Sequence, residues 1–439
     1  MPNLIGKNGR LFSDPQPGAD EVSFKVDNTS DSYYNSPYYK QHQDQVLPIP
    51  SPRAKPPRMN LSDVLDDPFV QAIQAAKKIS FHSVGDTGAA KSSGPATEAS
   101  VADMMSADIR DGGSGAPAFF FHLGDIVYYF GESQYYYDQF YEPYRAYDRP
   151  IFAIPGNHDG VLHDAKGQTL QAFLQNFCAD QPGRSPNAGG LVRSVMTEPG
   201  VYFTLDAPFV SIIGLYTNVL EGPGVISSQG GRYPVSDEQI RFLQDELTRL
   251  KPMRESGQCA VIVATHHPPL SADAKHGGTE GLFQDIDKAC QAAGLWPDAV
   301  LSGHAHLYQR FTRRTAGHEI PYVVSGSGGF SATPPMVNVP PAPYTQGDVT
   351  MEIDPVIQFG YLTLTVDVSG NNKLLTIAFN SPKLGANYDR VTVDLTKSRI
   401  VKSGSRVASA AKKAAAKSAS KGKTVRPKAK SKTARKSRN

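Results

Sequence analysis

The chain has 439 residues, 39% of them hydrophobic, so it is long enough to bury a substantial core. Its three cysteines, Cys178, Cys259 and Cys290, are widely spaced and odd in number, which excludes a framework of disulfides. No uncharged apolar stretch is long enough to span a bilayer, and the first residues do not resemble a signal peptide, so we expect a cytoplasmic protein.

The first 59 residues are rich in Pro, Asn, Ser, Asp and Tyr and show no sustained periodicity. We expect residues 1–59 to form an extended or partly ordered arm. Asp67 followed by Pro68 is typical of a helix N-cap and first turn, which predicts a helix that continues to Lys78. This helix would lead into the first strand of a folded domain, which we expect over residues 60–396.

Five short apolar runs each end at a group of polar residues. The runs cover residues 79–84, 118–123, 151–154, 261–264 and 299–301. Their nearly continuous hydrophobicity predicts buried strands. Ligands in open α/β sheets gather beyond the carboxyl ends of such strands, so groups that are far apart in sequence can meet in one crevice. The groups read GDTG (85–88), GDIVY (124–128), GNHD (156–159), THHP (265–268) and GHAH (303–306).

These groups contain carboxylates, an amide and imidazoles, which are the donors that hold two cations side by side. Two such cations clamp the attacking and leaving oxygens of a phosphoryl displacement. Each group alone has an ordinary structural alternative, because an Asp after a strand is often a helix cap or turn residue. His304 and His306 are a stronger signal, since alternate residues of an extended segment share one face. Five groups in this order favour a dinuclear metal site.

The later part of the chain predicts one clear helix and three more strands. Ser236 and Gln239 have the spacing of a capping box, and apolar residues at helical spacing continue until Pro252, so we predict a helix between them. It follows a strand predicted at residues 210–215, and this alternation predicts layers of helix against sheet. Frequent Gly and Pro over residues 326–357 indicate a long loop near the pocket. The three further strands cover residues 361–368, 374–379 and 390–395.

The end of the chain is a separate polycation. Residues 397–439 contain 16 Lys and Arg and no Asp or Glu, which leaves 29 basic against 42 acidic residues elsewhere. We expect this tail to be disordered, because it offers few apolar residues for packing. Its Lys- and Ala-rich composition resembles the tails of linker histones, and such segments bind nucleic acid without sequence preference. The alternatives are a solubilising role or attraction to polyphosphate, an anionic membrane or the chain's own acidic domain.

Between residues 79 and about 310 the sequence resembles the calcineurin-like metallophosphoesterase superfamily. Its members carry a first Asp motif, then GD, GNH, an isolated His and GHxH. GDTG followed by GDIVY is similar to the purple acid phosphatase branch, in which a tyrosine replaces a histidine of the first motif. The resemblance implies an α/β fold, a four-layer α/β/β/α sandwich of two mixed sheets with a dinuclear metal site at strand ends.

The resemblance also implies a ligand set for two ions. Asp125 would bridge both ions. Carboxylate and phenolate donors suit Fe(III), while amide and imidazole donors suit a divalent Fe, Zn or Mn. The first ion would be held by Asp86, Asp125, Tyr128 and His306, and the second by Asp125, Asn157, His266 and His304.

Two of these assignments have alternatives. His266 rather than His267 is the expected ligand, because the family pattern is His-x-Pro and Pro268 stands two positions after His266. His267 is a candidate for contact with substrate. Tyr128 lies in a segment rich in aromatic residues, so a purely structural place in the core is the alternative to ligation.

His158 and Asp159 are expected to be catalytic. In the family, the histidine equivalent to His158 stabilises the transition state and helps to protonate the leaving oxygen, and Asp159 is placed to orient its ring. Tyr308 and Arg310 directly follow GHAH and are candidates for substrate binding, because arginine pairs with phosphate bidentately. Arg193 and Arg232 are further candidates for phosphate contact.

The remaining histidines favour structural roles. His82 and His122 lie within predicted strands just before the polar groups, which favours a place in the core over ligation. His163 and His276 fall in polar loops that either rim the pocket or face solvent.

The function that follows is a dinuclear metal-dependent phosphatase, similar to acid phosphatases, that hydrolyses phosphomonoesters by attack of a metal-bound hydroxide. Its basic tail would tether it to nucleic acid. One alternative is a phosphodiesterase acting on nucleotides or nucleic-acid ends. Another is a nucleic-acid-binding protein with an inactive hydrolase core, although the intact ligand set argues against that reading.

Overall fold

The computed structural model describes residues 36–43, 45–88, 94–163, 165–217, 219–220, 222–274, 276–330 and 339–401. Most of the predicted N-terminal arm and almost all of the predicted basic tail lie outside these residues. None of the helices in the described part of the chain is long and apolar enough to cross a membrane.

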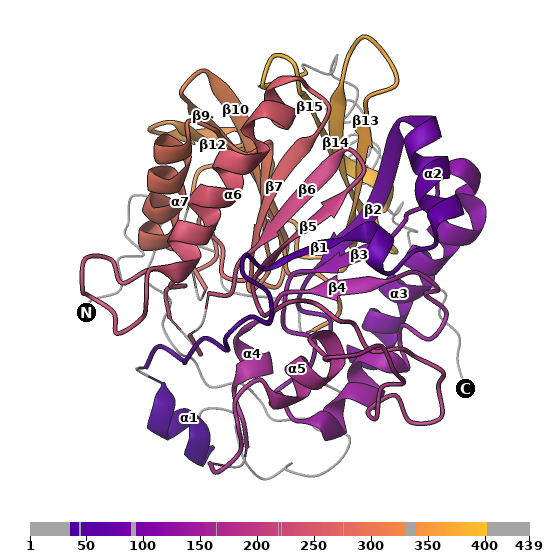
Figure 1. Ribbon diagram of the computed structural model, residues 1–439. Coiled ribbons are helices and arrows are strands. Elements are labelled where there is room, and N and C mark those ends of the chain that lie inside the picture. The colour runs from indigo at the N-terminus through magenta and orange to yellow at the C-terminus, as the bar shows by residue number, and fades with distance from the viewer. Residues whose placement is uncertain are drawn as a thin grey trace, which may run out of the picture. The chain divides into compact units, whose positions relative to one another are not determined.

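Two mixed β-sheets form the centre of the described domain (Figure 1). Apolar residues from both sheets share one buried cluster. The nine-stranded sheet has the order β1 (Arg58–Asn60), β5 (Phe203–Ala207), β6 (Val210–Gly214), β7 (Ala260–Thr265), β8 (Ala299–Ser302), β10 (His318–Ser325), β9 (Tyr308–Thr315), β12 (Val349–Met351) and β11 (Tyr344–Gln346). The seven-stranded sheet has the order β16 (Arg399–Ile400), β15 (Gly385–Asp394), β14 (Leu374–Ser381), β13 (Tyr361–Asp367), β2 (Lys78–Val84), β3 (Phe120–His122) and β4 (Ile151–Ala153). In each sheet, the strands that precede the polar groups are parallel neighbours.

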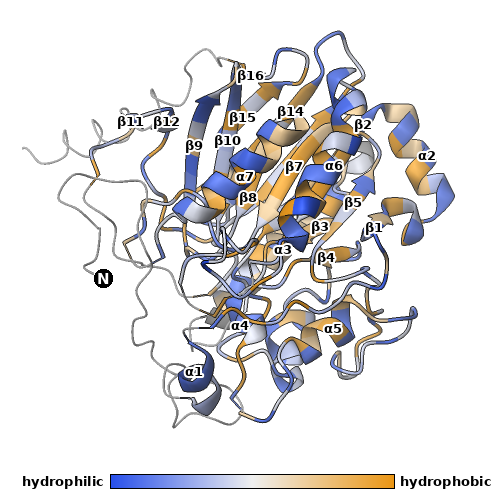
Figure 2. Ribbon diagram, turned by 60° about the vertical axis from the view of Figure 1, so that its left-hand side comes forward, coloured by the Kyte–Doolittle hydropathy of each residue, from blue (hydrophilic) through white to orange (hydrophobic). Residues whose placement is uncertain are grey.

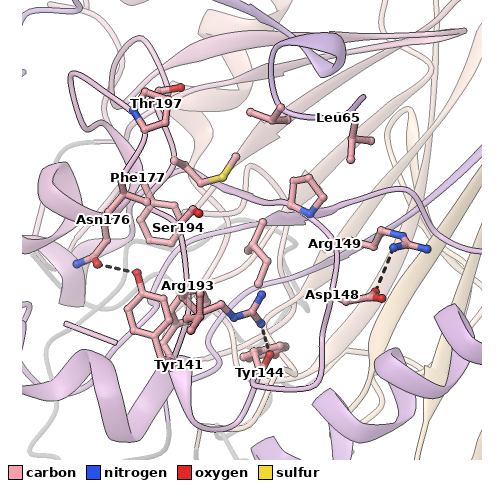
Figure 3. Close-up of a pocket in the computed structure, with 18 of the residues that line it drawn as sticks. Leu65, Tyr141, Tyr144, Asp148, Arg149, Asn176, Phe177, Arg193, Ser194 and Thr197 are labelled. Carbon is pink, nitrogen blue, oxygen red and sulfur yellow. Dashed lines mark hydrogen bonds and ion pairs between the residues drawn. The ribbon is translucent and has the colours of Figure 1, made fainter. Parts of the chain in front are cut away.

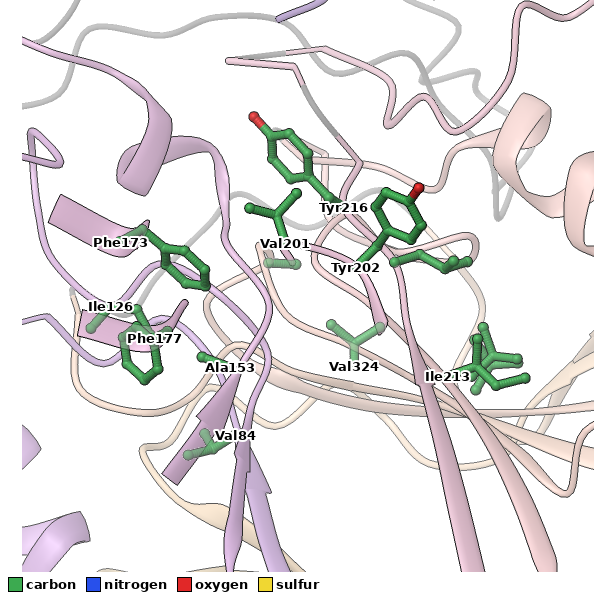
Figure 4. Packing of buried hydrophobic residues seen from close by; sticks show 14 of the residues in the cluster. Val84, Ile126, Ala153, Phe173, Phe177, Val201, Tyr202, Ile213, Tyr216 and Val324 are labelled. Atoms are coloured by element: carbon green, nitrogen blue, oxygen red, sulfur yellow. The ribbon is translucent and has the colours of Figure 1, made fainter. Parts of the chain in front are cut away.

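Strand alternation explains why both faces of these strands are buried. In β7, Ile262 and Ala264 belong to the apolar cluster between the sheets, whereas Val261 and Val263 face the helices. Residues of a strand point alternately to opposite faces, so a strand covered on both sides reads as a continuous apolar run. Figure 4 shows part of the cluster that contains Val261 and Val263, which also includes Phe173 of helix α5 and Val84 of β2.

Helices form the outer layers. Helices α6 (Glu238–Glu255) and α7 (Glu280–Ala293) pack against each other, and α6 contacts β6 and β7 of the nine-stranded sheet. On the other side, α3 (Gly94–Asp111) places its apolar residues in the same cluster as Phe120 of β3. Helix α2 (Asp67–Ala76) contacts β2 and packs Phe69 and Ile73 against the cluster between the sheets. Figure 2 shows the amphipathic character of α6 and α7 against the apolar central strands. The predicted α/β/β/α order of layers is confirmed.

Shorter elements complete the domain. The remaining α-helices are α1 (Pro37–His42), α4 (Asn157–Gly160) and α5 (Gln171–Phe177). The 3₁₀-helices are η2 (Leu61–Asp63), η3 (Gly113–Gly115) and η4 (Ser133–Tyr135), and η5 (Tyr137–Tyr141) is a π-helix.

The capping box predicted for α6 is wrong. Asp237 is the N-cap and makes no side-chain capping bond. The Gln239 amide instead bonds to the backbone N–H and carbonyl of Tyr216, because it is buried and needs partners there. Pro252 does not end the helix either, since a proline in the last turn removes only one backbone bond and α6 continues to Glu255.

The expected limits of the folded domain are also corrected at both ends. Tyr38 and Tyr39 of α1 are buried, and β1 pairs in parallel with β5, so the fold begins before residue 60. At the other end, β16 pairs with β15 and the compact unit extends to Ile400 rather than ending at residue 396. Edge strands of two or three residues carry too little pattern to be recognised in sequence.

The loop predicted over residues 326–357 contains two short strands. Strands β11 and β12 form a hairpin, and β12 also pairs with β9. Residues 331–338, in the middle of the predicted loop, lie outside the described part of the chain.

Candidate metal centre

The five polar groups meet at one edge of the two sheets. They follow the carboxyl ends of β2, β3, β4, β7 and β8, which are parallel within their sheets. Six of the seven expected metal ligands are buried, and His306 is partly exposed. The buried six are Asp86, Asp125, Tyr128, Asn157, His266 and His304.

Three of these residues, Asp86, Asp125 and His306, converge on the phenol of Tyr128. Its hydroxyl donates to Asp125 Oδ2 at 2.7 Å and to Asp86 Oδ1 at 3.0 Å. His306 Nε2 lies 3.3 Å from the same oxygen and 3.4 Å from Asp86 Oδ1. The donor atoms expected for the first ion are therefore within contact distance of one another.

A second group of donors adjoins the first. Asn157 Oδ1 lies 3.0 Å from both His266 Nε2 and His304 Nδ1. His266 Nε2 is also 3.4 Å from Asp125 Oδ2, the oxygen that accepts from Tyr128. Asp125, His266 and His304 each present a ligand atom within 4.8 Å of the others. Asp125 therefore belongs to both groups, as a bridging carboxylate would.

The backbone at this edge is strained where the ligands project. Asp86, Asp125 and His304 have φ angles of 59°, 56° and 67°, in the left-handed region that residues with a side chain rarely adopt. Such conformations persist when the surrounding structure over-determines them. Gly156 is needed for a different reason, because a Cβ at this position would lie 2.1 Å from Asp125 Oδ1.

Asp159 holds the ligand loops rather than the His158 ring. Its carboxylate accepts backbone N–H groups from Asp125 at 2.9 Å, Ile126 at 3.0 Å and Gly156 at 2.8 Å. The expectation that Asp159 orients the ring of His158 is therefore wrong, because its oxygens are used by the backbone of two loops. Asp159 positions Asp125 instead.

Backbone carbonyls orient two of the histidines. His158 Nδ1 lies 2.9 Å from the carbonyl of Tyr129, and its backbone N–H donates to Asp125 Oδ1 at 2.9 Å. His266 Nδ1 lies 2.8 Å from the carbonyl of Leu123. A carbonyl only accepts, so each Nδ1 carries a proton, and these contacts fix the orientation of both rings.

His267 and His276 also lie beside the centre. His267 Nδ1 is 2.6 Å from Thr217 Oγ1, and its ring centroid is 4.2 Å from that of His304. His276 Nδ1 is 2.7 Å from Asp273 Oδ2, and its ring centroid is 4.8 Å from His304. The sequence offered no signal that distinguishes His276 from an ordinary loop histidine.

The donor set fits metal ions. His304 Nε2, His267 Nε2 and Asn157 Nδ2 are buried without a hydrogen-bond partner in the described part of the chain. Buried polar atoms are normally paired, so an unpaired cluster indicates a missing partner. Burial lowers the pKa of both His267 and His304, and neighbouring histidines lower it further, which keeps these imidazoles neutral and able to donate a lone pair.

Tyr308 and Arg310 are not brought to the centre. The Tyr308 hydroxyl donates to Asp389 Oδ2 at 2.6 Å, and Arg310 donates to both oxygens of the same carboxylate. Tyr308 also stacks on Phe379, with ring centroids 4.2 Å apart. Both residues project from the same face of β9 toward the other sheet, which does not support a substrate-binding role.

The other candidates have partners elsewhere. His82 Nε2 lies 3.2 Å from Asp108 Oδ2, and His122 Nε2 lies 2.9 Å from Thr87 Oγ1. Arg193 donates to the carbonyl of Tyr144, away from the metal candidates.

Two supporting residues carry no recognisable sequence signal. Gln139 of the π-helix accepts the backbone N–H of Tyr128 at 2.8 Å and donates to its carbonyl at 2.5 Å. Phe330 stacks on the Tyr128 ring with centroids 3.6 Å apart and planes within 5°. Both contacts fix the phenol that faces the two carboxylates, and both arise only from the tertiary fold.

Solved structures similar to this one include three with low sequence identity. The Plasmodium protein GAP50, the anchor in the inner membrane complex, shares 15% identity over 77% of this chain and 94% of its own, with a TM-score of 0.52. A purple acid phosphatase from yellow lupin (Lupinus luteus) seeds shares 17% over 73% of this chain and 54% of its own, with a TM-score of 0.48. A dimetal phosphatase from Danio rerio shares 13% over 72% and 99%, with a TM-score of 0.42. The chain thus spans about half the length of the lupin protein.

At these identities the structural similarity bears on the fold alone, and no curated protein matches the sequence. The family model for calcineurin-like phosphoesterases matches residues 82–308, which include all five polar groups and more than half of the chain. The protein therefore belongs to the calcineurin-like phosphoesterase family.

Proposed function

We propose that this phosphoesterase is a phosphomonoesterase of the purple acid phosphatase type that uses two metal ions. The observation that carries the proposal is the position of Asp125 Oδ2, which is shared by the Tyr128 and His266 groups at 2.7 Å and 3.4 Å. The two ions, when bound, would activate the attacking water and hold the oxygens of the phosphoryl group.

Residues around the metal ligands would supply proton transfer and contacts to the phosphate. His158 is held by the carbonyl of Tyr129, and its ring lies 4.3 Å from that of Tyr128, so it is placed to donate a proton to the leaving oxygen. His276, oriented by Asp273, lies on the side of His304 and His306 and is placed to contact the phosphate. His158 directly follows the ligand Asn157 in α4, whereas His276 lies on the segment between β7 and α7.

Comparison of two substrates tests the reaction class. We expect p-nitrophenyl phosphate to be hydrolysed faster than bis-p-nitrophenyl phosphate by the metal-loaded protein, and His276→Ala to raise KM for the monoester. Arg314→Met, an exposed substitution on the far part of β9, is the matched control. Faster hydrolysis of the bis-ester would contradict the proposal and indicate a phosphodiesterase.

For the first metal position we propose Fe(III), because two carboxylates and a phenol surround it. A phenolate bound to Fe(III) absorbs visible light, so the oxidised, iron-loaded protein should be coloured and Tyr128→Phe should lose the band. A colourless wild-type protein that contains iron would contradict the assignment of Tyr128.

We propose further that the basic tail tethers the enzyme to nucleic acid. The proposal is supported by the 14 Lys and Arg of residues 402–439, a segment with no acidic residue. Removal of residues 402–439 should abolish most binding of duplex DNA and leave turnover of p-nitrophenyl phosphate nearly unchanged. In the full chain, each neutralised phosphate should add about 0.9 to the slope of log affinity against log salt. An unchanged slope after truncation would show that the tail is not the binding element.

A further inference from the structure

A cavity separate from the metal centre opens at the far end of strand β4. It has a volume of about 530 Å³, within the range of small-molecule sites. Pro150 and Ile151, at the start of β4, line it, whereas Asn157 follows the end of the same strand. The cavity and the metal centre are therefore at opposite ends of one strand.

The walls of the cavity combine aromatic and aliphatic side chains with four charged ones, which are Asp63, Asp148, Arg149 and Arg193. Phe140 and Tyr141 of the π-helix, Tyr144 and Phe177 provide ring surfaces, and Leu65 closes the opposite side (Figure 3). The Tyr141 hydroxyl donates to Asn176 Oδ1 at 2.6 Å, so this polar group is already satisfied within the wall. The lining therefore offers a flat apolar body its best contacts.

One cation in the wall, Arg193, has no ion-paired carboxylate among the described residues. Its half-buried guanidinium donates to the carbonyl of Tyr144. Asp148, whose charge acts on Arg193, is ion-paired with Arg149 at 3.3 Å. Burial lowers the pKa of Arg193, which reflects the cost of keeping this cation partly out of water. An anionic ligand would offset that cost.

The cavity shares the π-helix with the metal centre. Phe140 and Tyr141 face the cavity, while Gln139, the preceding residue, holds the backbone of Tyr128 at both its N–H and its carbonyl. π-Helical turns are uncommon and often occur at functional sites. A ligand that shifts this turn would therefore move Gln139, which holds the backbone of Tyr128.

We propose that this cavity is an effector site for a small organic anion with an aromatic body, and that its occupancy acts on hydrolysis through Gln139 and Tyr128. Arg193 binds the anionic group, and the aromatic wall binds the ring. The site is distinct from the phosphoester site, because none of its lining residues belongs to the metal candidates.

Two fluorescent probes test the binding site without relying on turnover. Anilinonaphthalene sulfonate carries an anionic group, and phenylnaphthylamine has the same rings without it. We expect the sulfonate to bind at one site per chain and at least about tenfold more tightly than the neutral probe, and Arg193→Met to remove that difference while Arg193→Lys retains most of it. Arg145→Met, an exposed change next to Tyr144 in sequence and outside the lining, is the control.

A second variant distinguishes loss of probe binding from loss of folding. Ser194 is exposed at the cavity, so Ser194→Trp should fill the space and weaken both probes without removing a charge. All variants are compared by thermal unfolding. Equal binding of the two probes to the wild type, or unchanged sulfonate binding in both Arg193→Met and Ser194→Trp, would overturn the site.

Kinetics separate the effector site from the metal centre. Saturating sulfonate probe should change kcat for p-nitrophenyl phosphate by about fivefold or more in the wild type, and this change should be absent in Arg193→Met. An unchanged kcat would overturn the coupling to Tyr128. Purely competitive inhibition that persists in Arg193→Met would place the probe at the metal centre and overturn the proposal.

Discussion

The metal centre and the cluster of Tyr308, Arg310 and Asp389 both combine buried acids with a phenol, but they differ in how fully their polar atoms are paired. In the cluster, both Asp389 oxygens accept from Arg310, and one also accepts from Tyr308 at 2.6 Å. In the metal centre, His304 Nε2 and Asn157 Nδ2 have no partner in the described part of the chain.

This difference separates structural from functional polar groups. A closed ion pair satisfies its members and joins the two sheets, so it needs no ligand. The metal centre brings carboxylates and imidazoles together and leaves His304 Nε2 buried and unpaired among the described residues, an arrangement that bound ions would complete. Residue type alone did not distinguish the two clusters.

The largest expected effect comes from the shared carboxylate. Asp125→Ala should lower turnover by about 10⁴-fold or more, because loss of both ions removes several kcal/mol of transition-state stabilisation. Elemental analysis should show that both ions are lost. Retention of two ions with normal turnover would contradict the bridging role.

His158→Ala should have a smaller effect of a different kind. We expect turnover to fall by about 10²–10⁴-fold, because proton transfer to the leaving oxygen is lost while both ions stay bound. Steady-state kinetics with metal analysis of the same sample measures this, and His318→Ala, outside the centre, is the control. Turnover close to that of the wild type would make His158 a bystander.

Asp159→Asn should act through the ligand loops. The amide has one acceptor where the carboxylate takes three backbone N–H groups, so metal affinity should fall by about 10–100-fold. The free energy of unfolding should fall by about 1–3 kcal/mol. Asp111→Asn, at an exposed position of α3, should change neither quantity. Normal metal affinity in Asp159→Asn would show that Asp159 does not support the metal ligands.

Tyr308→Phe should have the smallest effect on the reaction. It removes the bond to Asp389, so the free energy of unfolding should fall by about 1–3 kcal/mol, while kcat and KM stay within about twofold. Denaturant unfolding and steady-state kinetics measure the two effects. A tenfold rise in KM would show that Tyr308 contributes to substrate binding and would contradict the distinction between the two clusters.

The sequence predicted the strands before the polar groups to within about two residues, because buried parallel strands read as continuous apolar runs. Their common edge then brought the expected ligands together. What the sequence missed depends on contacts between distant segments. Gln139 holds Tyr128 and Asp159 accepts from Asp125, but neither pairing has a periodic pattern. Tyr308 and Arg310 follow GHAH closely, yet the alternation of β9 turns both away from the centre.

The central claim is that one cluster sharing Asp125 holds two catalytic ions. The direct measurement is turnover of p-nitrophenyl phosphate by metal-free protein as metal is added, with bound metal counted in the same samples. We predict that turnover rises to a plateau at two ions per chain and that Asp125→Ala shows neither binding nor turnover. Full turnover by the metal-free protein, or a plateau at a single ion, would contradict the claim.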